Sequence, residues 1–532
     1  MNSITVEKLP RANSPEEVGV SSQTVISFLQ DLNDSGILMH NFMLIRHGKV
    51  FAEGSWSPYK ADIPRQLFSF SKSVTSTAIG FCIDEGRLSL EDKVISFFPD
   101  KQPKKMTEDS KNLTIRHLLT MHSGKKFDAL SDKSSYDWVE DFMNTPFTYH
   151  PGEQFEYINE NTFMLSAIVT RVTGMPMVDY LMPRLFEPLG ISKPDWESET
   201  NGINAGGWGL YLPIEGMAKI LQCYLNKGEF GGKQVIPRDW VEQATAKQVR
   251  NDINRGEDNA FESIQGYGYQ IWRASVPNSY RFDGMFGQYG FVLPDYDAVL
   301  VTQAGMPGHN CIIRAFQRHF PEGYKDGVLP EDPEALAELR EMCRNLALDD
   351  LPQDKRNSKM EYLLEGRTIK VRKNKIGMLS QAVITMMAVK ELSIDNIRMT
   401  FHKDYMDFAW SEKDVVNKIK IGLGDEAYYD QMHLCGMDFI TRGKATWHED
   451  GSLEVRVRAM ETVQERRFIF KFKGKKVKII TGSQPDINIL AGTTKKYIEK
   501  VIPVRFLVPL CKVIFDKFAG LYMEPNISGR IV

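Results

Sequence analysis

The sequence is poor in the features that mark several protein classes. Its 532 residues contain six cysteines, and none of them forms a CxxC pair or a Cys/His cluster. We therefore expect no zinc site, and we interpret each cysteine as a buried structural thiol. The first residues, "MNSITVEKLPRANSPEEVG", lack the apolar stretch of a secretory signal, so a cytoplasmic location is expected.

Long uninterrupted hydrophobic runs are also missing. The segment "IGMLSQAVITMMAV" is short, and "VIPVRFLVPLCKVIFDKFAGLYM" is interrupted by charges at Arg505, Lys512, Asp516 and Lys517. Spanning a bilayer usually needs about 20 nearly continuous apolar residues. We expect core or interface helices here and no transmembrane segment, with contact of the second helix with a membrane surface as an alternative.

Charge of one sign does not dominate either. The formal net charge is −3, and basic and acidic residues are mixed along the chain. A nucleic-acid-binding protein needs a concentrated basic face, which the sequence does not indicate, so no nucleic-acid partner is expected. With 42% hydrophobic and 25% charged residues, the chain has ordinary globular composition and is long enough for two or more domains.

The first part of the chain has strand patterns at both ends and helical patterns between them. Two apolar runs flank His47-Gly48-Lys49, which indicates a hairpin, and two more flank the turn at Pro294-Asp295-Tyr296-Asp297. Helical signals dominate from Phe70 to about Asn226. This arrangement predicts an α+β domain whose antiparallel sheet is completed by distant segments.

A second domain is expected after a linker near residues 349–359. The helical segment "DPEALAELREMCRNLAL" precedes this polar stretch, and period-two alternation follows it, as in "DGSLEVRVRAM" and "RRFIFKFKGKKVKII". We predict a domain over residues 1–350 and a β-rich accessory domain over residues 351–532. The second domain would be an antiparallel meander or small barrel with a C-terminal helix.

The stretch "LFSFSKSVTSTAIGF" begins a helix and carries a lysine in an unusual place. Ser69 is predicted to be the N-cap, with its hydroxyl accepting a bond from a first-turn N–H. A capping box would place Glu or Gln three residues later, but Lys72 stands there, near the positive end of the helix dipole. Residues three apart are neighbours on a helix, so a Lys72 with a lowered pKa could activate the Ser69 hydroxyl as its base.

The pattern S-x-x-K alone is weak evidence. Ser57 and Ser123 also precede a lysine by three residues, but only Ser69 opens a long helical pattern with an apolar stripe. The alternative for Ser69 is an ordinary N-cap beside a solvated lysine.

Two further segments could complete a site around Ser69. Tyr157-Ile158-Asn159 stands at a loop-to-helix junction, where Tyr157 could move a proton and Asn159 could bind a substrate carbonyl or Lys72. The alternative for Tyr157 is a core tyrosine. The glycine-rich "RFDGMFGQYGFV" could add a backbone N–H to that of Ser69 as an oxyanion hole, or it could serve only a hairpin.

These motifs occur in an order that resembles the serine β-lactamase-related family. That family includes class C β-lactamases, D-Ala-D-Ala carboxypeptidases, esterases and 6-aminohexanoate-dimer hydrolases. The resemblance runs from about residue 15 to 320 and rests on "LFSFSKSVTSTAIG", "LTIRHLLTMHSG", "PGEQFEYIN", "LFEPLGI", "AGGWGLYL", "GYGYQIW" and "GQYGFVLPDYDAVLV". It implies Ser69 as nucleophile, Lys72 as general base and Tyr157 as catalytic partner. It also implies a β-lactamase/transpeptidase-like sheet flanked by helices with a helical subdomain.

One landmark departs from the family pattern. The β-lactamases and carboxypeptidases carry Lys-Thr-Gly, and many esterases His-x-Gly, at positions that are Ser279, Tyr280 and Arg281 here. The lysine that would bind a substrate carboxylate is missing unless Arg281 replaces it. The oxyanion donor is left open between the N–H groups of Phe282 and Asp283.

We therefore expect a serine hydrolase that acts on small esters, amides or short peptides through an acyl-enzyme and without a cofactor or metal. Expected substrate-binding residues are Asn159, Asp283 and Gly284. The alternatives are a D-amino-acid peptidase, carboxypeptidase or β-lactamase, and a non-catalytic binding protein with the same fold. The C-terminal domain could cover the cleft or mediate formation of a homo-oligomer.

Overall fold

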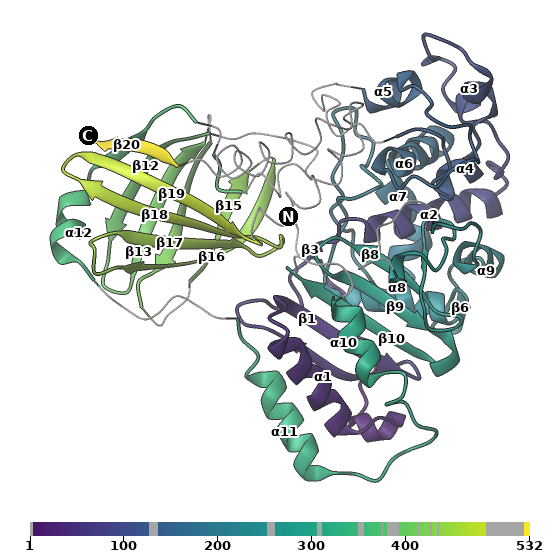
Figure 1. Cartoon of the computed structure of the whole chain (residues 1–532), viewed down its shortest axis with the longest axis horizontal. Coiled ribbons are helices and arrows are strands. Elements are labelled where there is room, and N and C mark those ends of the chain that lie inside the picture. Colours follow the sequence, from purple (N-terminus) through teal and green to yellow (C-terminus); the bar gives the residue numbers. More distant parts are fainter. Residues whose placement is uncertain are drawn as a thin grey trace, which may run out of the picture. The chain divides into compact units, whose positions relative to one another are not determined.

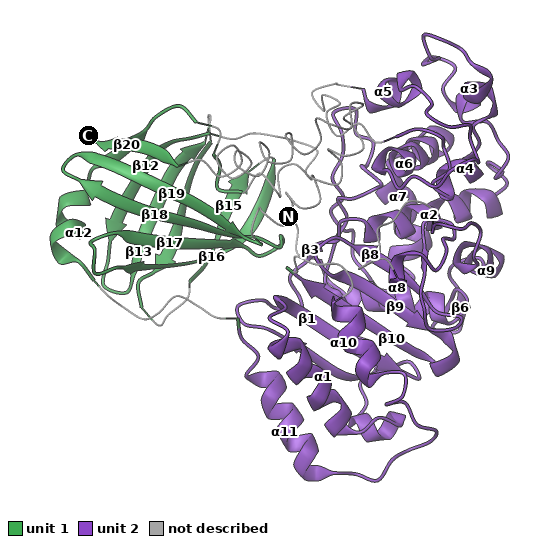
Figure 2. Cartoon of the chain, viewed as in Figure 1, with its two compact units in different colours: residues 1, 305–308, 348–532 green, residues 2–304, 309–347 purple. Residues whose placement is uncertain are grey.

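The computed structural model contains two compact units (Figure 1 and Figure 2). The N-terminal unit comprises residues 2–304 and 309–347, and the C-terminal unit comprises residues 348–532 with 1 and 305–308. The structure describes residues 4–126, 137–252, 261–305, 311–348, 356–374, 376–379, 393–412, 415–424, 428–434, 436–485 and 526–532. The predicted linker, most of the segment "IGMLSQAVITMMAV" and the predicted C-terminal helix lie largely or wholly outside these residues.

A six-stranded antiparallel sheet forms the centre of the N-terminal unit. Its strand order is β2-β1-β10-β9-β8-β7. The bounds are β1 Met39–Arg46, β2 Lys49–Ser55, β7 Trp272–Arg273, β8 Tyr280–Gly284, β9 Gln288–Leu293 and β10 Ala298–Ala304. Both predicted hairpins are confirmed, and His47 and Gly48 have the positive φ values, 52° and 71°, that a tight two-residue turn requires.

Helices cover both faces of this sheet (Figure 1). On one face, the helices are α1 Ser22–Asp34, α10 Cys311–His319 and α11 Pro333–Arg344. Phe316 of α10 contacts both Phe28 of α1 and Phe291 of β9 there. On the other face, Phe282 of β8 contacts Phe70 and Tyr224, which belong to α2 Phe70–Asp84 and α8 Ile214–Leu225.

A helical subdomain is inserted between β2 and β7. Its helices are α3 Glu108–Asn112, α4 Ile115–Leu119, α5 Trp138–Asn144, α6 Asn159–Thr173, α7 Met177–Leu181 and α9 Arg238–Thr245. Two short strand pairs lie in the same part of the chain: β3 Arg65–Gln66 pairs with β4 Tyr211–Leu212, and β5 Glu229–Phe230 pairs with β6 Lys233–Gln234. The prediction of an α+β fold, with a helical subdomain and an antiparallel sheet completed by distant segments, is confirmed.

Helix α2 is buried on all sides, which goes beyond the single apolar stripe that the sequence indicates. Every residue from Phe70 to Cys82 is buried. Its hydroxyl side chains bond the surrounding chain: Ser73 donates to the Gln270 carbonyl, Ser76 to the Tyr269 carbonyl and Thr75 to the Gly206 carbonyl. These bonds satisfy polar groups that would otherwise be costly to bury, and they fix loops around the start of the helix.

The C-terminal unit is a ten-stranded sheet that curls into a barrel-like domain, so the predicted small barrel is confirmed. Its strands pair antiparallel except for β14 with β16, which pair in parallel. Its strand order is β14-β13-β12-β11-β20-β19-β18-β17-β16-β15. The bounds are β11 Thr368–Val371, β12 Ile394–Phe401, β13 Tyr405–Glu412, β14 Val415–Gly422, β15 Tyr428–Leu434, β16 Met437–Trp447, β17 Leu453–Ala459, β18 Glu465–Lys473, β19 Lys476–Gln484 and β20 Ile527–Ile531. Strand β14 also pairs with β16, where Gly443 admits the side chain of Ile421.

Among the described residues, no helix is long and apolar enough to cross a bilayer. The described cysteines are free thiols. Cys82 and Cys223 are buried as expected, whereas Cys311 and Cys343 are only half-buried, so the expectation is wrong for these two.

Gly80 provides a test of how tightly α2 is enclosed. A Cβ at Gly80 would lie 2.3 Å from Cγ of Trp240, whereas a Cβ at Gly216 of α8 would lie 3.4 Å from Cδ2 of Leu212, an ordinary contact. We expect Gly80→Ala to lower the free energy of unfolding by about 1–3 kcal/mol, because the indole must move. Gly216→Ala should instead raise it by up to about 1 kcal/mol, through helix propensity.

Urea unfolding of both variants, followed by tryptophan fluorescence, measures these changes. Effects of the same sign for the two glycines would contradict the close packing of α2 against α9.

Candidate active site

Ser69 immediately precedes α2, but it does not cap the helix with its side chain. Its backbone is already helical, with φ −70° and ψ −9°, and its hydroxyl makes no cap bond. The predicted N-cap bond is therefore wrong, because the hydroxyl is bonded to the side chain of Lys72 instead. Phe68, just before it, has a φ of +48°, an uncommon value for a large residue that places a sharp bend at the start of the helix.

The Lys72 amine is held by three oxygen atoms. Its Nζ lies 3.0 Å from Ser69 Oγ, 2.6 Å from Asn159 Oδ1 and 2.7 Å from the Gly207 carbonyl oxygen. The residue is only 1% exposed. The start of α2, the start of α6 and the loop before β4 therefore converge on this one nitrogen.

Burial lowers the pKa of Lys72 from 10.5 to about 7, and the charge of Glu160 opposes this shift only in part. A neutral amine has two N–H groups and one lone pair. The amide oxygen of Asn159 and the carbonyl of Gly207 can only accept hydrogen bonds, so they use the two N–H groups. The lone pair is then left to face the Ser69 hydroxyl, which is the geometry of a general base.

Gly206 and Gly207 allow the Gly207 carbonyl, one of the three oxygens around the Lys72 amine, to come close to α6. A Cβ at Gly206, whose φ is +67°, would lie 2.9 Å from the carbonyl oxygen of Thr162 in α6, and one at Gly207 would lie 3.1 Å from that of Asn159. Only a chain without these side chains can approach α6 so closely. Sequence reasoning missed the role of the Gly207 carbonyl, although the paired glycines of "AGGWG" were a signal of close backbone approach.

Tyr157 lies beside Lys72, as the sequence predicts for a partner of this lysine. The Lys72 Nζ is 5.0 Å from the centre of the Tyr157 ring. The ring is held by Trp272 and Tyr267, at centroid distances of 5.2 Å and 6.3 Å. Tyr157, Asn159, Lys72 and Ser69 therefore form one cluster, built from the two junctions where α2 and α6 begin.

The end of β8 reaches the chain just before Ser69. Gly284 lies so close to Leu67 that a Cβ on it would be 2.2 Å from the Leu67 carbonyl oxygen. In the following turn, Phe286 contacts Phe68 at a ring-centroid distance of 5.3 Å. The side chain of Phe282 points into the core against α2. Gly284, one of the three predicted substrate-binding residues, thus lies near Ser69.

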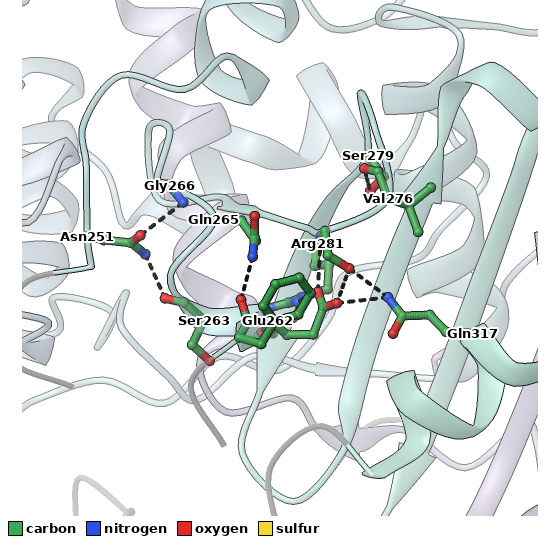
Figure 3. Close-up of polar contacts among 12 residues, drawn as sticks. Asn251, Glu262, Ser263, Gln265, Gly266, Val276, Ser279, Arg281 and Gln317 are labelled. Atoms are coloured by element: carbon green, nitrogen blue, oxygen red, sulfur yellow. Dashed lines mark hydrogen bonds and ion pairs between the residues drawn. The ribbon is translucent and has the colours of Figure 1, made fainter. Parts of the chain in front are cut away.

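The side chains of Arg281 and Asp283 belong to a different environment. Arg281 is fully buried and donates to both oxygens of Asp283, at 3.1 and 2.9 Å, and to Glu262 at 2.7 Å. Figure 3 shows Arg281 beside Glu262, and Gln317 of α10 donates to that carboxylate. Since Gln317 belongs to a helix on the sheet face opposite α2, this network lies on that face, away from Ser69. The positive charge of Arg281 is therefore already balanced by the carboxylates of Glu262 and Asp283.

The other two S-x-x-K matches lack such an environment. Ser57 is exposed and precedes Pro58 in a loop. In the match that begins at Ser123, the Lys126 ammonium lies over the ring of Tyr149, 4.9 Å from its centre. Among the described residues, no group of His, Cys, Asp and Glu side chains is arranged to hold a metal ion.

Comparison with known proteins adds the family context. The family model described as Beta-lactamase matches residues 26–305, more than half of the chain. A 6-aminohexanoate-dimer hydrolase of Paenarthrobacter ureafaciens is 24% identical over 313 residues, which cover 56% of this chain and 78% of that protein. A lovastatin esterase of Penicillium rubens is 26% identical over 170 residues, 27% of this chain and less than half, 42%, of the esterase.

Among solved structures, a penicillin-binding protein homologue from Caulobacter crescentus matches with a TM-score of 0.47 and 17% identity. The match covers 60% of this chain and all of that one.

The role of Arg281 can be tested directly. If Arg281 only compensates Glu262 and Asp283, Arg281→Met should lower the free energy of unfolding by about 3–5 kcal/mol, because it leaves buried carboxylates unpaired. The matched control is Arg318→Met, which breaks an exposed pair with Asp31 and should cost at most about 1 kcal/mol. The ratio of kcat/KM for anionic and neutral esters should not change.

Denaturant unfolding and steady-state kinetics provide the two measurements. A selective loss of the anionic ester in a folded Arg281→Met protein would instead show that Arg281 binds the substrate carboxylate.

Proposed function

The chain belongs to the Beta-lactamase family, and we propose that it is a serine hydrolase that cleaves small esters or amides through an acyl-enzyme on Ser69. The observation that carries this proposal is the environment of Lys72. A buried amine with a pKa of about 7 lies 3.0 Å from the Ser69 hydroxyl, and its other two hydrogen-bonding positions are occupied by acceptors. Burial lowers the pKa of Lys125 to about 7 as well, but that amine bonds the carbonyls of Phe142 and Thr145, so the hydroxyl beside Lys72 is what marks Lys72 as a base.

The first step is attack on the substrate carbonyl. The neutral Lys72 amine takes the proton of Ser69, and the Ser69 oxygen forms a bond to the carbonyl carbon. The resulting ammonium keeps its bonds to Asn159 and Gly207, so no side chain has to move when the charge appears. Asn159 is assigned here to the orientation of Lys72, in place of a direct contact with substrate.

The negative charge on the tetrahedral oxygen needs donors close to Ser69. We assign this role to the N–H groups of Ser69 and Met285, the first residue after β8, in place of the N–H of Phe282 or Asp283 that the sequence suggested. Among the described residues, no group accepts a hydrogen bond from either N–H. Gly284 supports the assignment, because its contact with Leu67 brings this turn against the start of α2.

For the leaving group to depart, the proton that Lys72 took from Ser69 must be transferred to it. The Lys72 ammonium lies against the Tyr157 ring, so the Tyr157 hydroxyl is the group we assign to pass a proton to the departing alcohol or amine. A water molecule then takes the place of the leaving group and is deprotonated by the same amine. Its attack releases the acid and restores Ser69.

The preferred substrate class follows from the absence of a basic side chain that could bind a substrate carboxylate. The family lysine is replaced at Ser279, and Arg281 is bound by two carboxylates, so no basic side chain at these positions is left to bind a substrate carboxylate. Neutral esters and amides fit this site better than β-lactams or peptides with a free carboxylate. The names of the two relatives, a 6-aminohexanoate-dimer hydrolase and a lovastatin esterase, support hydrolysis of a small molecule, whereas the preference for neutral substrates rests on the absence of the cation alone.

The role of Lys72 as base is tested with Lys72→Arg. A guanidinium cannot give up its proton in a protein, so acylation of Ser69 by an activated ester should slow by at least about 10²-fold, although the positive charge is kept. In the wild type, acylation should increase with pH through about 7, because the lowered pKa makes the amine neutral above that value.

Mass spectrometry of the Ser69 peptide and stopped-flow kinetics measure both effects, with the thermal midpoint as control for folding. An adduct on Ser57 or Ser123, or a folded Lys72→Arg protein that retains more than about a tenth of the rate, would refute the mechanism.

A second test concerns the substrate. We expect the kcat/KM for nitrocefin to be below that for the best neutral p-nitrophenyl ester, by roughly 10- to 100-fold. The missing charge-assisted bond to the β-lactam carboxylate is worth about 1.5–3 kcal/mol. A preference for nitrocefin in the same assay would favour a β-lactamase.

A further inference from the structure

Basic side chains gather on the outward face of adjacent strands in the C-terminal unit, although charges are mixed along the sequence. In the sheet, Lys473 of β18 lies opposite Lys476 of β19, Lys476 lies opposite Arg530 of β20, and Arg530 lies opposite Lys370 of β11. All four side chains are exposed. They form a single row across four strands, which we call the basic row.

The basic row is not compensated by acidic residues. In the part of the chain that the structure describes, none of its four cations has a carboxylate within ion-pair distance. In the next row, Lys471 and Lys478 are also opposite each other, and only Lys471 has an acidic partner, Asp450. Like charges directly opposite one another destabilise a sheet. A row of four such charges is therefore a feature that the fold alone does not require.

Exposed apolar side chains lie at the end of the barrel where this row is found. Helix α12, Ser358–Leu364, presents Tyr362, 86% exposed, and Leu363, 38% exposed, together with Lys359 one turn earlier. The chain then enters β11, where Thr368 bonds Val532, which is 65% exposed. The neighbouring Ile531 N–H donates to the Lys475 carbonyl in the β18–β19 turn.

Figure 1 shows α12, β20 and the C-terminal residue at this same end of the barrel. Val532 therefore adjoins the basic row through β11, and α12 lies at the same end of the barrel, where it packs against β12.

We propose that this end of the C-terminal barrel binds the surface of an anionic lipid bilayer. Lysines near such a surface are attracted to its negative headgroups, and Tyr, Leu and Val side chains can enter the interface between headgroups and acyl chains. Nucleic acid would use the cations equally well, but it offers no apolar layer for Tyr362, Leu363 and Val532. The combination of both kinds of side chain favours lipid.

Sedimentation with vesicles tests the proposal on the full chain. Binding to phosphatidylcholine vesicles with about 30% phosphatidylserine should exceed binding to pure phosphatidylcholine by at least about tenfold, and salt should weaken it. Lys370→Gln/Lys473→Gln/Lys476→Gln should reduce binding by roughly 100-fold, at about fivefold per lysine. The matched control is Lys104→Gln/Lys105→Gln/Lys233→Gln, which removes three exposed lysines of the N-terminal unit and should bind like the wild type.

Removal of like charges should leave the thermal midpoint of the basic-row variant unchanged or higher, so weaker binding cannot come from unfolding. Tyr362→Ser, which keeps every charge, should reduce vesicle binding severalfold. Equal binding of wild type to neutral and anionic vesicles, or equal losses in the two triple variants, would overturn the proposal. Tighter binding to a DNA or RNA duplex than to anionic vesicles, with Tyr362→Ser unchanged, would also overturn it and assign the basic row to nucleic acid.

Discussion

The burial of the Lys72 amine is the constraint on which the catalytic arrangement depends. Burial is what lowers the pKa of this amine to near neutral, so the helix that carries it must be enclosed. Helix α2 meets this requirement with hydroxyl side chains that bond neighbouring loops, and with Gly80, which admits the indole of Trp240. The same enclosure brings the Gly207 carbonyl and the Asn159 amide to the amine. The same packing around α2 therefore both removes water from the Lys72 amine and orients it toward Ser69.

Much of this arrangement could be predicted from the sequence, because the chemistry depends on residues at short spacing. Ser69 and Lys72 are neighbours on any helix, and the Tyr157–Asn159 junction was recognised by its position before a helical pattern. The contribution of the Gly207 carbonyl was missed, because the paired glycines of "AGGWG" indicate a close backbone approach but do not show which group the carbonyl would bond. The pairing of Arg281 with Glu262 could not be predicted either. Its nearest carboxylates include Glu262, nineteen residues away along the chain, and the fold alone determines that they meet.

In the fold, too, features set by neighbouring residues were predictable from the sequence, and features set by distant residues were not. Hairpins with short turns, such as that at His47 and Gly48, were predictable because the turn residues and the flanking alternation are adjacent in sequence. The pairing of β1 with β10 joins segments about 250 residues apart, and only the general expectation of a sheet completed from both ends was possible. The concentration of charge on the barrel was missed for a related reason. Period-two alternation predicts which residues face outward, but the register between strands decides which cations become neighbours.

The lowered pKa of Lys72 also couples catalysis to the thermodynamics of folding. Between pH of about 7 and 10.5, this group is protonated in the unfolded chain and neutral in the folded one, so folding releases a proton. Because the unfolded state binds more protons in that window, the contribution of Lys72 to stability becomes more favourable as pH rises through it, and its cost is greatest below pH 7. Unfolding at mildly alkaline pH must take a proton back from the buffer. The measured enthalpy of unfolding therefore contains the ionisation heat of whichever buffer supplies that proton, and it differs between buffers of the same pH.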